Sequence, residues 1–390
     1  MEVCAKDKCT GCYACVNACS HGCISMREDE LGCVHPVVDE TNCVNCGLCK
    51  SSCPNNIELK YSYPIKCYAS WIEDKEKRKI CASGGIGTCM SEYVIKHGGV
   101  VFGSRYDSEL TPIMTYTERI DELERFKGSR YVQSLVGNDT YKDVRTFLRS
   151  GRLVLFIGTP CQIAGLKTFL RKDYDNLITV DLICHGVCPT KYFKEEVAYL
   201  TEKYNLNGVA DIRFRGNDGN NYREKILRLD EAQQYYIKGF LLGISMRENC
   251  YSCNYSRPER VSDITIGDFI GLGKIVPFNF PTHNVSSVTT NTSRGLEFYR
   301  KVSEEANELI NVEREYKERL QYKPSLIHPF ERHPLNAEFV KLYKKKGYLF
   351  AIHNVLHNSL RNEQIKSYLN YWTYSYRIPR KLIKILFKIK

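Results

Sequence analysis

The sequence predicts a small α+β module, an α/β domain with a partly parallel sheet, and a helical C-terminal tail. A cysteine pattern that occurs twice within the first 60 residues indicates the module, and buried strands that alternate with helices indicate the α/β domain. Because 390 residues exceed the usual size of one compact domain, more than one folded unit is expected. We divide the chain into the module at residues 1–60, two parts of the larger domain at 61–145 and 146–290, and the tail at 291–390.

The composition is that of a globular protein and excludes a disordered one. Hydrophobic residues make up 43% of the chain and charged residues 26%. No stretch of about 18 apolar residues is present, so no membrane-spanning helix is expected, and the first residues lack the apolar segment of a signal peptide. The 19 cysteines cluster at metal-ligand spacings, so we expect a reducing cytoplasm and not a disulfide-stabilised secreted protein.

The cysteines of the module form two runs with the same C-x2-C-x2-C-x3-C spacing. The first run is Cys9, Cys12, Cys15 and Cys19, and the second is Cys43, Cys46, Cys49 and Cys53. In proteins with this pattern three thiolates of a run bind one 4Fe-4S cluster, and the fourth binds the other cluster. We therefore expect a ferredoxin-like module with two clusters, whose ligand sets are Cys9, Cys12, Cys15 and Cys53, and Cys43, Cys46, Cys49 and Cys19.

Two features of the module leave room for other interpretations. The first run ends in Cys19-Ser20 where bacterial ferredoxins have proline, which alters the local turn but removes no ligand. A zinc knuckle is disfavoured, because zinc sites use pairs of cysteines and seldom duplicated runs of four. Cys4, Cys23 and Cys33 lie outside the repeat, and we expect them to be small buried residues and not ligands.

Strands and helices alternate along the larger domain. We expect strands at residues 66–71, 100–103, 153–157 and 177–183, and helices at 90–97 and 163–170. The strand, helix and strand between residues 153 and 183 imply parallel neighbours with a right-handed crossover. The loops after these two strands then share the edge of the sheet where open α/β folds bind ligands, and they carry Cys161 and Cys184.

Four cysteines of the larger domain form a candidate third cluster site. Cys161 and Cys184 end neighbouring strands, and Cys250 and Cys253 form a C-x2-C pair that can bind one side of a cluster. Alternatively, the first two are loop thiols and the pair is a separate metal or redox site. Cys188 is expected to be a bystander, although it could replace Cys184.

A glycine-rich segment precedes the helix expected at residues 90–97. It contains Ser83, Gly84, Gly85, Gly87 and Thr88. Glycines let backbone N–H groups approach a ligand, and the N-terminal end of the helix favours a phosphate, so the pyrophosphate of FAD would suit the segment. Taken by itself, such a segment is as often a tight turn as a cofactor site.

Six segments of the chain, in their order and spacing, resemble one family. They are KCYASW, ASGGIGT, KGSRYVQS, GTPCQIAGL, DLICHGV and RENCYSCNYSRPERVSDITIGDF. The chain resembles the beta subunit family of coenzyme F420 hydrogenase/dehydrogenase over about residues 1–290, and this implies an oxidoreductase that binds FAD and 4Fe-4S clusters. The resemblance further implies flavin contacts from Ser83, Gly84, Gly85, Gly87, Thr88, Lys127, Ser129, Arg130, Gln133, Thr159 and Pro160.

Several other side chains have open roles. His185, beside a candidate ligand, is expected to hydrogen-bond to a cluster or shuttle a proton and not to act as a catalyst. Cys81 and Cys89 flank the glycine-rich segment and are expected to be buried. Orientation of a flavin or substrate and a solvated loop position are equally open for Asp263, Asp268, Arg213 and Arg215.

These features favour an iron-sulfur flavoprotein that couples hydride transfer at FAD to single-electron transfer through the clusters and an external carrier or redox partner protein. Its small-molecule substrate could be F420, or a sugar intermediate of surface polysaccharide synthesis. The main alternative is a non-catalytic electron-relay subunit of a larger redox complex. A scaffold without reducible clusters is disfavoured by the intact cysteine repeat.

The net charge of +11 is concentrated in the last fifty residues. A basic surface favours acidic partners, but no nucleic-acid recognition motif accompanies the basic residues, so we expect no nucleic-acid role. Residues 380–390 read RKLIKILFKIK, a basic amphipathic pattern. This segment could lie on an anionic membrane surface or pack against the protein's own core.

Overall fold

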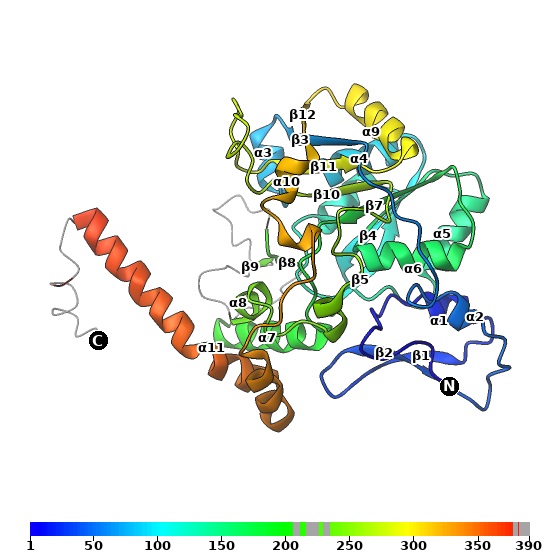
Figure 1. Ribbon diagram of the computed structural model, residues 1–390, viewed down its shortest axis with the longest axis horizontal. Helices are drawn as coiled ribbons and strands as arrows, with labels where there is room; N and C mark the ends of the chain where they lie inside the picture. The colour runs from blue at the N-terminus through cyan, green and yellow to red at the C-terminus, as the bar shows by residue number, and fades with distance from the viewer. Residues whose placement is uncertain (206–210, 216–225, 229–234, 377–380, 382–390) are drawn as a thin grey trace.

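The computed structural model describes residues 1–205, 211–215, 226–228, 235–376 and 381. The N-terminal module lies against a larger domain that is built around one mixed sheet, and the helix α11 extends away from both (Figure 1). This arrangement confirms the predicted α+β module followed by an α/β domain with a partly parallel sheet.

The module contains two short helices and one hairpin. Helices α1 (Ala14–Ala18) and α2 (Leu48–Ser51) each begin within a cysteine run, after Tyr13 and Gly47, whose φ angles are 63° and 73°. The left-handed residue turns the chain sharply, so that successive cysteines of a run point to a common centre. Strands β1 (Ile24–Glu28) and β2 (Val34–Val38) pair antiparallel and connect the two halves. The equivalent placement of α1 and α2 reflects the repeat in the sequence.

The larger domain is organised around an eight-stranded sheet. Its order is β12-β3-β11-β10-β7-β6-β4-β5, and β4, β6, β7 and β10 are mutually parallel. The strands are β3 (Lys66–Ile72), β4 (Val100–Tyr106), β5 (Pro112–Thr117), β6 (Val154–Gly158), β7 (Leu177–Leu182), β10 (Ile264–Asp268), β11 (Ser286–Thr290) and β12 (Leu309–Arg314). Strands β8 (Asp211–Arg213) and β9 (Ile226–Arg228) form a separate parallel pair.

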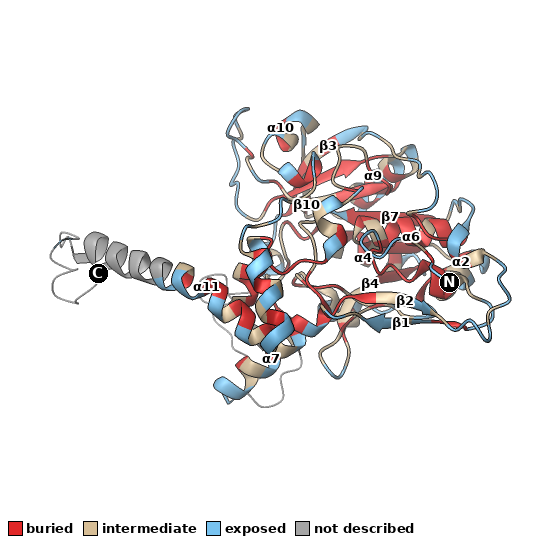
Figure 2. Ribbon diagram, turned by 60° about the horizontal axis from the view of Figure 1, so that its bottom comes forward, coloured by how far each residue is buried: buried red, intermediate tan, exposed pale blue. Residues whose placement is uncertain are grey.

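Helices cover both faces of the sheet, and the alternation of strand side chains explains why. In β6, Val154 and Phe156 enter the core beneath α5 (Thr140–Arg149) and α6 (Pro160–Leu170), whereas Leu155 enters the opposite core beneath α4 (Ile86–Lys96) and α9 (Ser293–Glu305). The module docks on the α5 and α6 face, where α1 contacts both helices. The strands and α6 are largely buried (Figure 2).

A third core joins α7 (Thr190–Lys203), α8 (Tyr235–Leu241) and the first part of α11 (Asn336–Tyr376). Stacked aromatic rings such as Tyr192 and Tyr348, with centroids 4.8 Å apart, fill it. Near its start α11 is interrupted at Gly347, which has a φ of 78°. The remaining helices are short: α3 (Lys75–Lys79), α10 (Tyr316–Leu320), and the 3-10 helices η1 (Ile120–Phe126), η2 (Glu248–Ser252) and η3 (Pro324–Leu326).

The sheet domain extends past the boundary that we drew at residue 290. Helix α9 packs on the sheet, and β12 pairs antiparallel with β3 as an edge strand. The sequence of β12, LINVER, lacks a regular apolar alternation, because polar residues stand on both sides of the strand: Leu309 joins one core, whereas Ile310 and Val312 pack against the core on the other face of the sheet. The helical segment begins with α10 and α11.

The proposed membrane contact concerns residues 380–390, which, apart from 381, lie outside the described residues. Within the described part of the chain, no helix is both long and apolar enough to cross a bilayer.

Candidate iron-sulfur and cofactor sites

The first ferredoxin ligand set converges in the structure. Cys9, Cys12, Cys15 and Cys53 are all buried. Burial raises the pKa of Cys12 to about 12, and the charges of Cys53 and Cys9 act on it in the same direction. Burial also raises the pKa of Cys15, and the charges of Cys12, Cys9 and Cys53 add to this shift. A hydrogen bond from Cys4 lowers the pKa of Cys9 to about 4 and also lowers the pKa of Cys53. The four sulfurs therefore share one environment that already favours two thiolates, and bound iron would favour all four.

The second set gathers at the outer end of the module. Burial raises the pKa of Cys49, and the charges of Cys43 and Cys19 add to this shift. Cys46, in the same run, is exposed. The crossed pairing of Cys19 with the second run and of Cys53 with the first thus agrees with the neighbours seen in the structure, and the ligand assignment itself stays a prediction.

Two cysteines outside the repeat lie beside these sets. The Sγ atoms of Cys19 and Cys23 are 3.4 Å apart, and contacts with Cys53 and Cys9 raise the pKa of Cys4. Each expected cluster thus has one additional thiol next to a ligand sulfur. No spacing rule in the sequence identifies these two residues.

The four cysteines of the candidate third site also come together. Cys161 stands in the first turn of α6, whose start is fixed by reciprocal hydrogen bonds between Thr159 and Gln162. Burial raises the pKa of Cys184 to about 11, and the charge of Cys253 adds to this shift. Burial likewise raises the pKa of Cys250, and the charges of Cys184, Cys253 and Cys161 raise it further. Cysteines from three places in the sequence therefore face one another.

The spacing of these thiols is wider than that of a single-ion site. Among the described residues, no three His, Cys, Asp or Glu side chains are close enough to hold one metal ion. In a 4Fe-4S cluster each cysteine binds a different iron atom, so the sulfurs of a ligand set stand farther apart than those around one ion.

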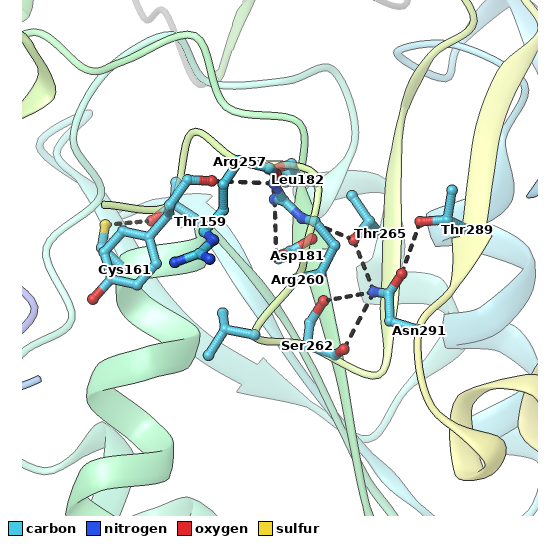
Figure 3. Close-up of polar contacts among 12 residues, drawn as sticks. Thr159, Cys161, Asp181, Leu182, Arg257, Arg260, Ser262, Thr265, Thr289 and Asn291 are labelled. Atoms are coloured by element: carbon cyan, nitrogen blue, oxygen red, sulfur yellow. Dashed lines mark hydrogen bonds and ion pairs between the residues drawn. The ribbon is translucent and has the colours of Figure 1, made fainter. Parts of the chain in front are cut away.

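A buried ion pair fixes the segment that carries Cys250 and Cys253 against β7. Arg260 contacts Asp181 at 3.0 Å, and the two side chains are 2% and 0% exposed. The same guanidinium donates to the carbonyls of Tyr255 and Arg257 (Figure 3). Asp181 Oδ2 accepts from Arg260, whereas its buried Oδ1 has no hydrogen-bond partner among the described residues. The pair holds the segment after Cys253 close to the strand that leads to Cys184.

The third set lies next to the first ferredoxin set. Gly165, one turn after Cys161 on the same face of α6, is so close to Cys12 that an added Cβ would stand 2.9 Å from its Sγ. The buried rings of Tyr141 and Tyr255 lie near both Cys12 and Cys161. Only glycine permits this approach of the module to α6.

Gln133 occupies a different place from the one expected. Its amide nitrogen donates to the carbonyl of Thr10 at 3.4 Å, and its oxygen accepts from Arg247 at 2.7 Å. Arg247 also donates to the carbonyls of Cys9 and Val34, at 3.0 and 3.2 Å. The Gln133 amide therefore serves the junction with the module and not a flavin pocket.

Arg130 is likewise engaged within the protein. Its guanidinium donates to the carbonyls of Lys127, Phe126 and Arg125, at 2.8, 3.1 and 2.5 Å, and stacks over the ring of Tyr106. The Nη1 and Nη2 atoms of Arg130 thus satisfy the C-terminal carbonyls of η1, whereas its buried Nε has no hydrogen-bond partner among the described residues.

The glycine-rich segment serves two purposes. Gly84 donates to Ser286 Oγ at 2.9 Å, and a side chain there would collide with the carbonyl of Ser70. Gly87 differs, because the nearest atoms to an added Cβ are Ile266 Cδ1 and Ile157 Cδ1, at 3.7 and 3.9 Å. Gly84 is thus a packing residue, whereas Gly87 faces a partly exposed apolar patch.

Other expected cofactor residues lie near the carboxyl ends of the strands. Ser83 Oγ is buried and has no hydrogen-bond partner among the described residues. The amide of Arg215 donates to Gly128 O at 3.2 Å, and its guanidinium pairs with Asp268, the last residue of β10. Lys127 and Ser129, on either side of Gly128, therefore lie beside this strand end. Both cations at this strand end are ion-paired, Arg215 with Asp268 and Lys127 with Glu124 at 3.0 Å. The unsatisfied Ser83 hydroxyl is therefore the group here that suits a phosphate-bearing cofactor.

Asp263, Arg213, His185 and Cys188 have structural surroundings. Asp263 is buried and accepts from Thr179 and Arg294. Arg213 binds Asp211 and Glu124. Burial lowers the pKa of His185 to about 4, and its ring packs against Phe240 and Phe330. Cys188 contacts Ser245 at 3.3 Å within the helical core, away from a ligand position, and Cys81 and Cys89 are buried as expected.

Two cations that the sequence did not single out lie near the third set. Arg319 is 0% exposed, and its Nε, Nη1 and Nη2 atoms have no hydrogen-bond partner in the part of the chain that the structure describes. Burial lowers the pKa of Lys323, one turn further on, which interacts with Arg319, Asp268 and Cys184. A buried guanidinium without a partner is costly, so this position suits an anionic ligand group.

Comparison with known families agrees with the cysteine patterns. Residues 8–57 match a 4Fe-4S dicluster domain, and residues 151–315 match the C terminus of the coenzyme F420 hydrogenase/dehydrogenase beta subunit. Over these residues the chain is similar to the F420 hydrogenase/dehydrogenase beta subunit family. The resemblance inferred from the sequence is thereby confirmed, and the chain is an iron-sulfur redox protein related to that subunit.

The F420 beta subunit match contains all four cysteines of the third set, whereas Arg319 and Lys323 lie just beyond it. A solved structure of the F420-reducing NiFe hydrogenase complex from Methanosarcina barkeri is 17% identical, with 66% of this chain and 85% of that chain covered and a TM-score of 0.45. No curated protein matches the chain.

Proposed function

We propose that this protein is an iron-sulfur flavoprotein oxidoreductase that couples two-electron chemistry at bound FAD to one-electron transfer through three 4Fe-4S clusters. The observation that carries the proposal is the adjacency of the third cysteine set to the first ferredoxin set through Cys161, Gly165 and Cys12. Three thiolate sets in sequence form a route from the sheet edge to the outer end of the module.

We place the FAD at the carboxyl-end edge of the parallel strands. Parallel α/β sheets bind ligands beyond the carboxyl ends of their strands, and β6, β7 and β10 all end there. Gly87 and Thr88 at the start of α4 would bind a phosphate group, with Ser83 Oγ as an additional hydrogen-bonding group. Lys127 would supply positive charge, and Ile157 and Ile266 would cover an aromatic ring system. Bound FAD would supply the exchange of a hydride for two single electrons.

Substrate selection would depend on the buried cations. Lys323 lies near both Arg319 and Cys184, so a substrate whose anionic group binds the two cations would have its redox-active part near the third cysteine set. Coenzyme F420, which the description of the matching family names, is the first candidate substrate. The chain's own residues would orient the substrate and exclude water, while electrons leave through the clusters.

An anaerobic preparation tests the proposal. We expect about twelve iron atoms, four for each of three clusters, and about one FAD per chain. Reduced F420 should then drive reduction of a viologen dye. Clusters without flavin would instead indicate an electron-relay subunit, and a fully loaded protein that reduces no viologen would exclude F420 as substrate.

A pair of serine variants tests the third set. Cys161→Ser should lower the iron content by about four atoms per chain and stop viologen reduction while the ferredoxin clusters remain. Cys188→Ser is the matched control. Cys188 is buried four residues after Cys184, but its sulfur contacts Ser245 and we do not expect it to bind the cluster. Equal iron content in both variants would remove the third cluster from the proposal.

A further inference from the structure

A groove separates the module from the larger domain beside the second ferredoxin set. It has a volume of about 510 Å³ and lies between the α1 and α2 side of the module and the ends of α5 and α6. Its lining residues are Asn17, Ala18, Ser20, Leu48, Ser52, Lys142, Arg145, Arg149, Phe169, Leu170, Arg171, Lys172 and Tyr174. Five of these are cations and none is an acid, so the groove is strongly basic.

Most of this positive charge is not neutralised. Arg171 donates to Ser51 Oγ and Ser52 Oγ at 2.8 and 3.1 Å, and Lys142 pairs with Asp139 at 2.8 Å. Arg145 and Lys172 lie over the rings of Phe169 and Tyr174, contacts that leave their charges intact. Within the residues that the structure describes, Arg145, Arg149 and Lys172 have no carboxylate partner.

The groove adjoins the part of the module where electrons would leave the protein. Ala18 and Ser20 flank Cys19, and Leu48 precedes Cys49. Cys46 is exposed, and Val44 beside it is 58% exposed. The groove itself combines its cations with apolar lining residues such as Leu48 and Phe169. This is the composition of a transient protein interface, in which electrostatics guides encounter and apolar contact completes it.

We propose that this groove docks an acidic electron-carrier protein, such as a ferredoxin, which exchanges single electrons with the second cluster. The inference rests on the proposed function and adds the partner and its docking surface. Two-electron oxidation of one molecule of reduced F420 balances one-electron reduction of two carrier molecules, with release of two protons. No bond forms between the two proteins, so a brief complex held by charge is sufficient.

Charge reversal tests the surface. Arg149→Glu and Lys172→Glu change two exposed groove cations that make no hydrogen bond or ion pair in the described residues, and Arg171 is left unchanged because it connects α6 to the module. The matched control reverses Lys75 and Lys317, exposed lysines of α3 and α10, which lie outside the groove. Both variants retain every cysteine.

The readouts are stopped-flow reduction of an acidic ferredoxin with two 4Fe-4S clusters, its binding by calorimetry, and reduction of methyl viologen. We expect the ferredoxin rate constant of the unchanged protein to fall steeply with ionic strength. In the groove variant it should fall at least about tenfold at low salt and lose most of its salt dependence. The rate of viologen reduction by the groove variant should stay within about twofold of the rate of the unchanged protein. The control variant should match the unchanged protein in both ferredoxin and viologen reduction.

The outcomes separate the two proposals. If the groove variant binds and reduces ferredoxin like the control while viologen reduction persists, the docking surface is refuted and the proposed function stands. If the unchanged, fully loaded protein reduces neither acceptor, both proposals fail. Binding of inorganic phosphate in the groove without any loss of ferredoxin reduction in the variant would assign the groove to a small anion and overturn the inference.

Discussion

Individual side chains in this protein often act away from the place that their chemical type suggests. Arg130 and Gln133 have the hydrogen-bonding groups that a flavin site needs, yet backbone carbonyls accept from both side chains, and the Gln133 oxygen accepts from Arg247. Arg319 carries the same guanidinium as Arg130 but has no partner among the described residues. The sequence shows which hydrogen-bond donors and acceptors a side chain has, whereas only the structure shows which of them already have a partner.

Replacement of Arg319 by methionine distinguishes a ligand-binding residue from a structural one. Without ligand, methionine removes a buried unpaired charge, so the variant should be as stable as the unchanged protein or more stable by about 1–3 kcal/mol. Affinity for an anionic substrate such as F420 should fall by about 100-fold, the equivalent of about 3 kcal/mol. Chemical denaturation of the substrate-free protein at equal cluster content and a KM measurement provide the two numbers.

A structural Arg319 would give the opposite result. If its guanidinium formed an ion pair in solution, methionine would cost about 3–5 kcal/mol of stability and leave KM unchanged. Arg319→Lys is a useful second variant, because it keeps the charge and loses only the forked hydrogen-bonding geometry.

At the scale of elements, local patterns predicted the inner strands but not their remote partners. The apolar runs of β4, β6 and β7 appear at the expected positions because strands buried on both faces are apolar throughout. Strand β11 pairs with β3 from more than two hundred residues away, and no local pattern encodes that register. The edge strand β12 was missed because polar residues stand on both of its sides and remove the alternation that indicates a strand. Likewise, spacing predicted the cysteine sets, whereas Arg319 belongs to no motif.

The start of α4 offers a comparison between two glycines of one segment. Gly84→Ala should cost about 1–3 kcal/mol of stability, because the added methyl meets the backbone of β3 and β11. Gly87→Ala should leave stability unchanged or raise it by up to about 1 kcal/mol, since alanine favours the helix. The same methyl would project toward Ile157 and Ile266, so the FAD content should fall.

Urea unfolding and flavin fluorescence after acid release measure both effects of the glycine variants. The assignment of the flavin to this edge would be wrong if Gly87→Ala retained a full complement of FAD with unaltered affinity. Gly84→Ala then serves as the reference for flavin loss that results only from a weakened fold.

At the scale of the whole molecule, the position of the module on the larger domain decides whether electrons can cross between them. Arg247 is 1% exposed and joins three segments, since it binds Gln133, Cys9 O and Val34 O. Gly165 lets the loop of Cys12 approach α6 on the same face. A few buried contacts therefore fix the orientation of the module on the larger domain. If these contacts were lost and the first and third cysteine sets moved apart by a few ångströms, electron transfer between their clusters would slow steeply.

Arg247→Met tests this coupling directly. The variant leaves two buried carbonyls and the Gln133 amide without a donor, so the junction should lose about 3–5 kcal/mol, and the module should become sensitive to proteolysis after residue 60. The cysteines remain, so iron content should be unchanged, while reduction of the ferredoxin clusters by substrate should slow at least about tenfold. Stopped-flow absorbance follows that step.

Arg300→Met, which removes an exposed pair with Glu297, should change neither property, because such pairs contribute about 0–1 kcal/mol. Unaltered cluster reduction and protease resistance in Arg247→Met would show that the module reaches its electron donor without this anchor.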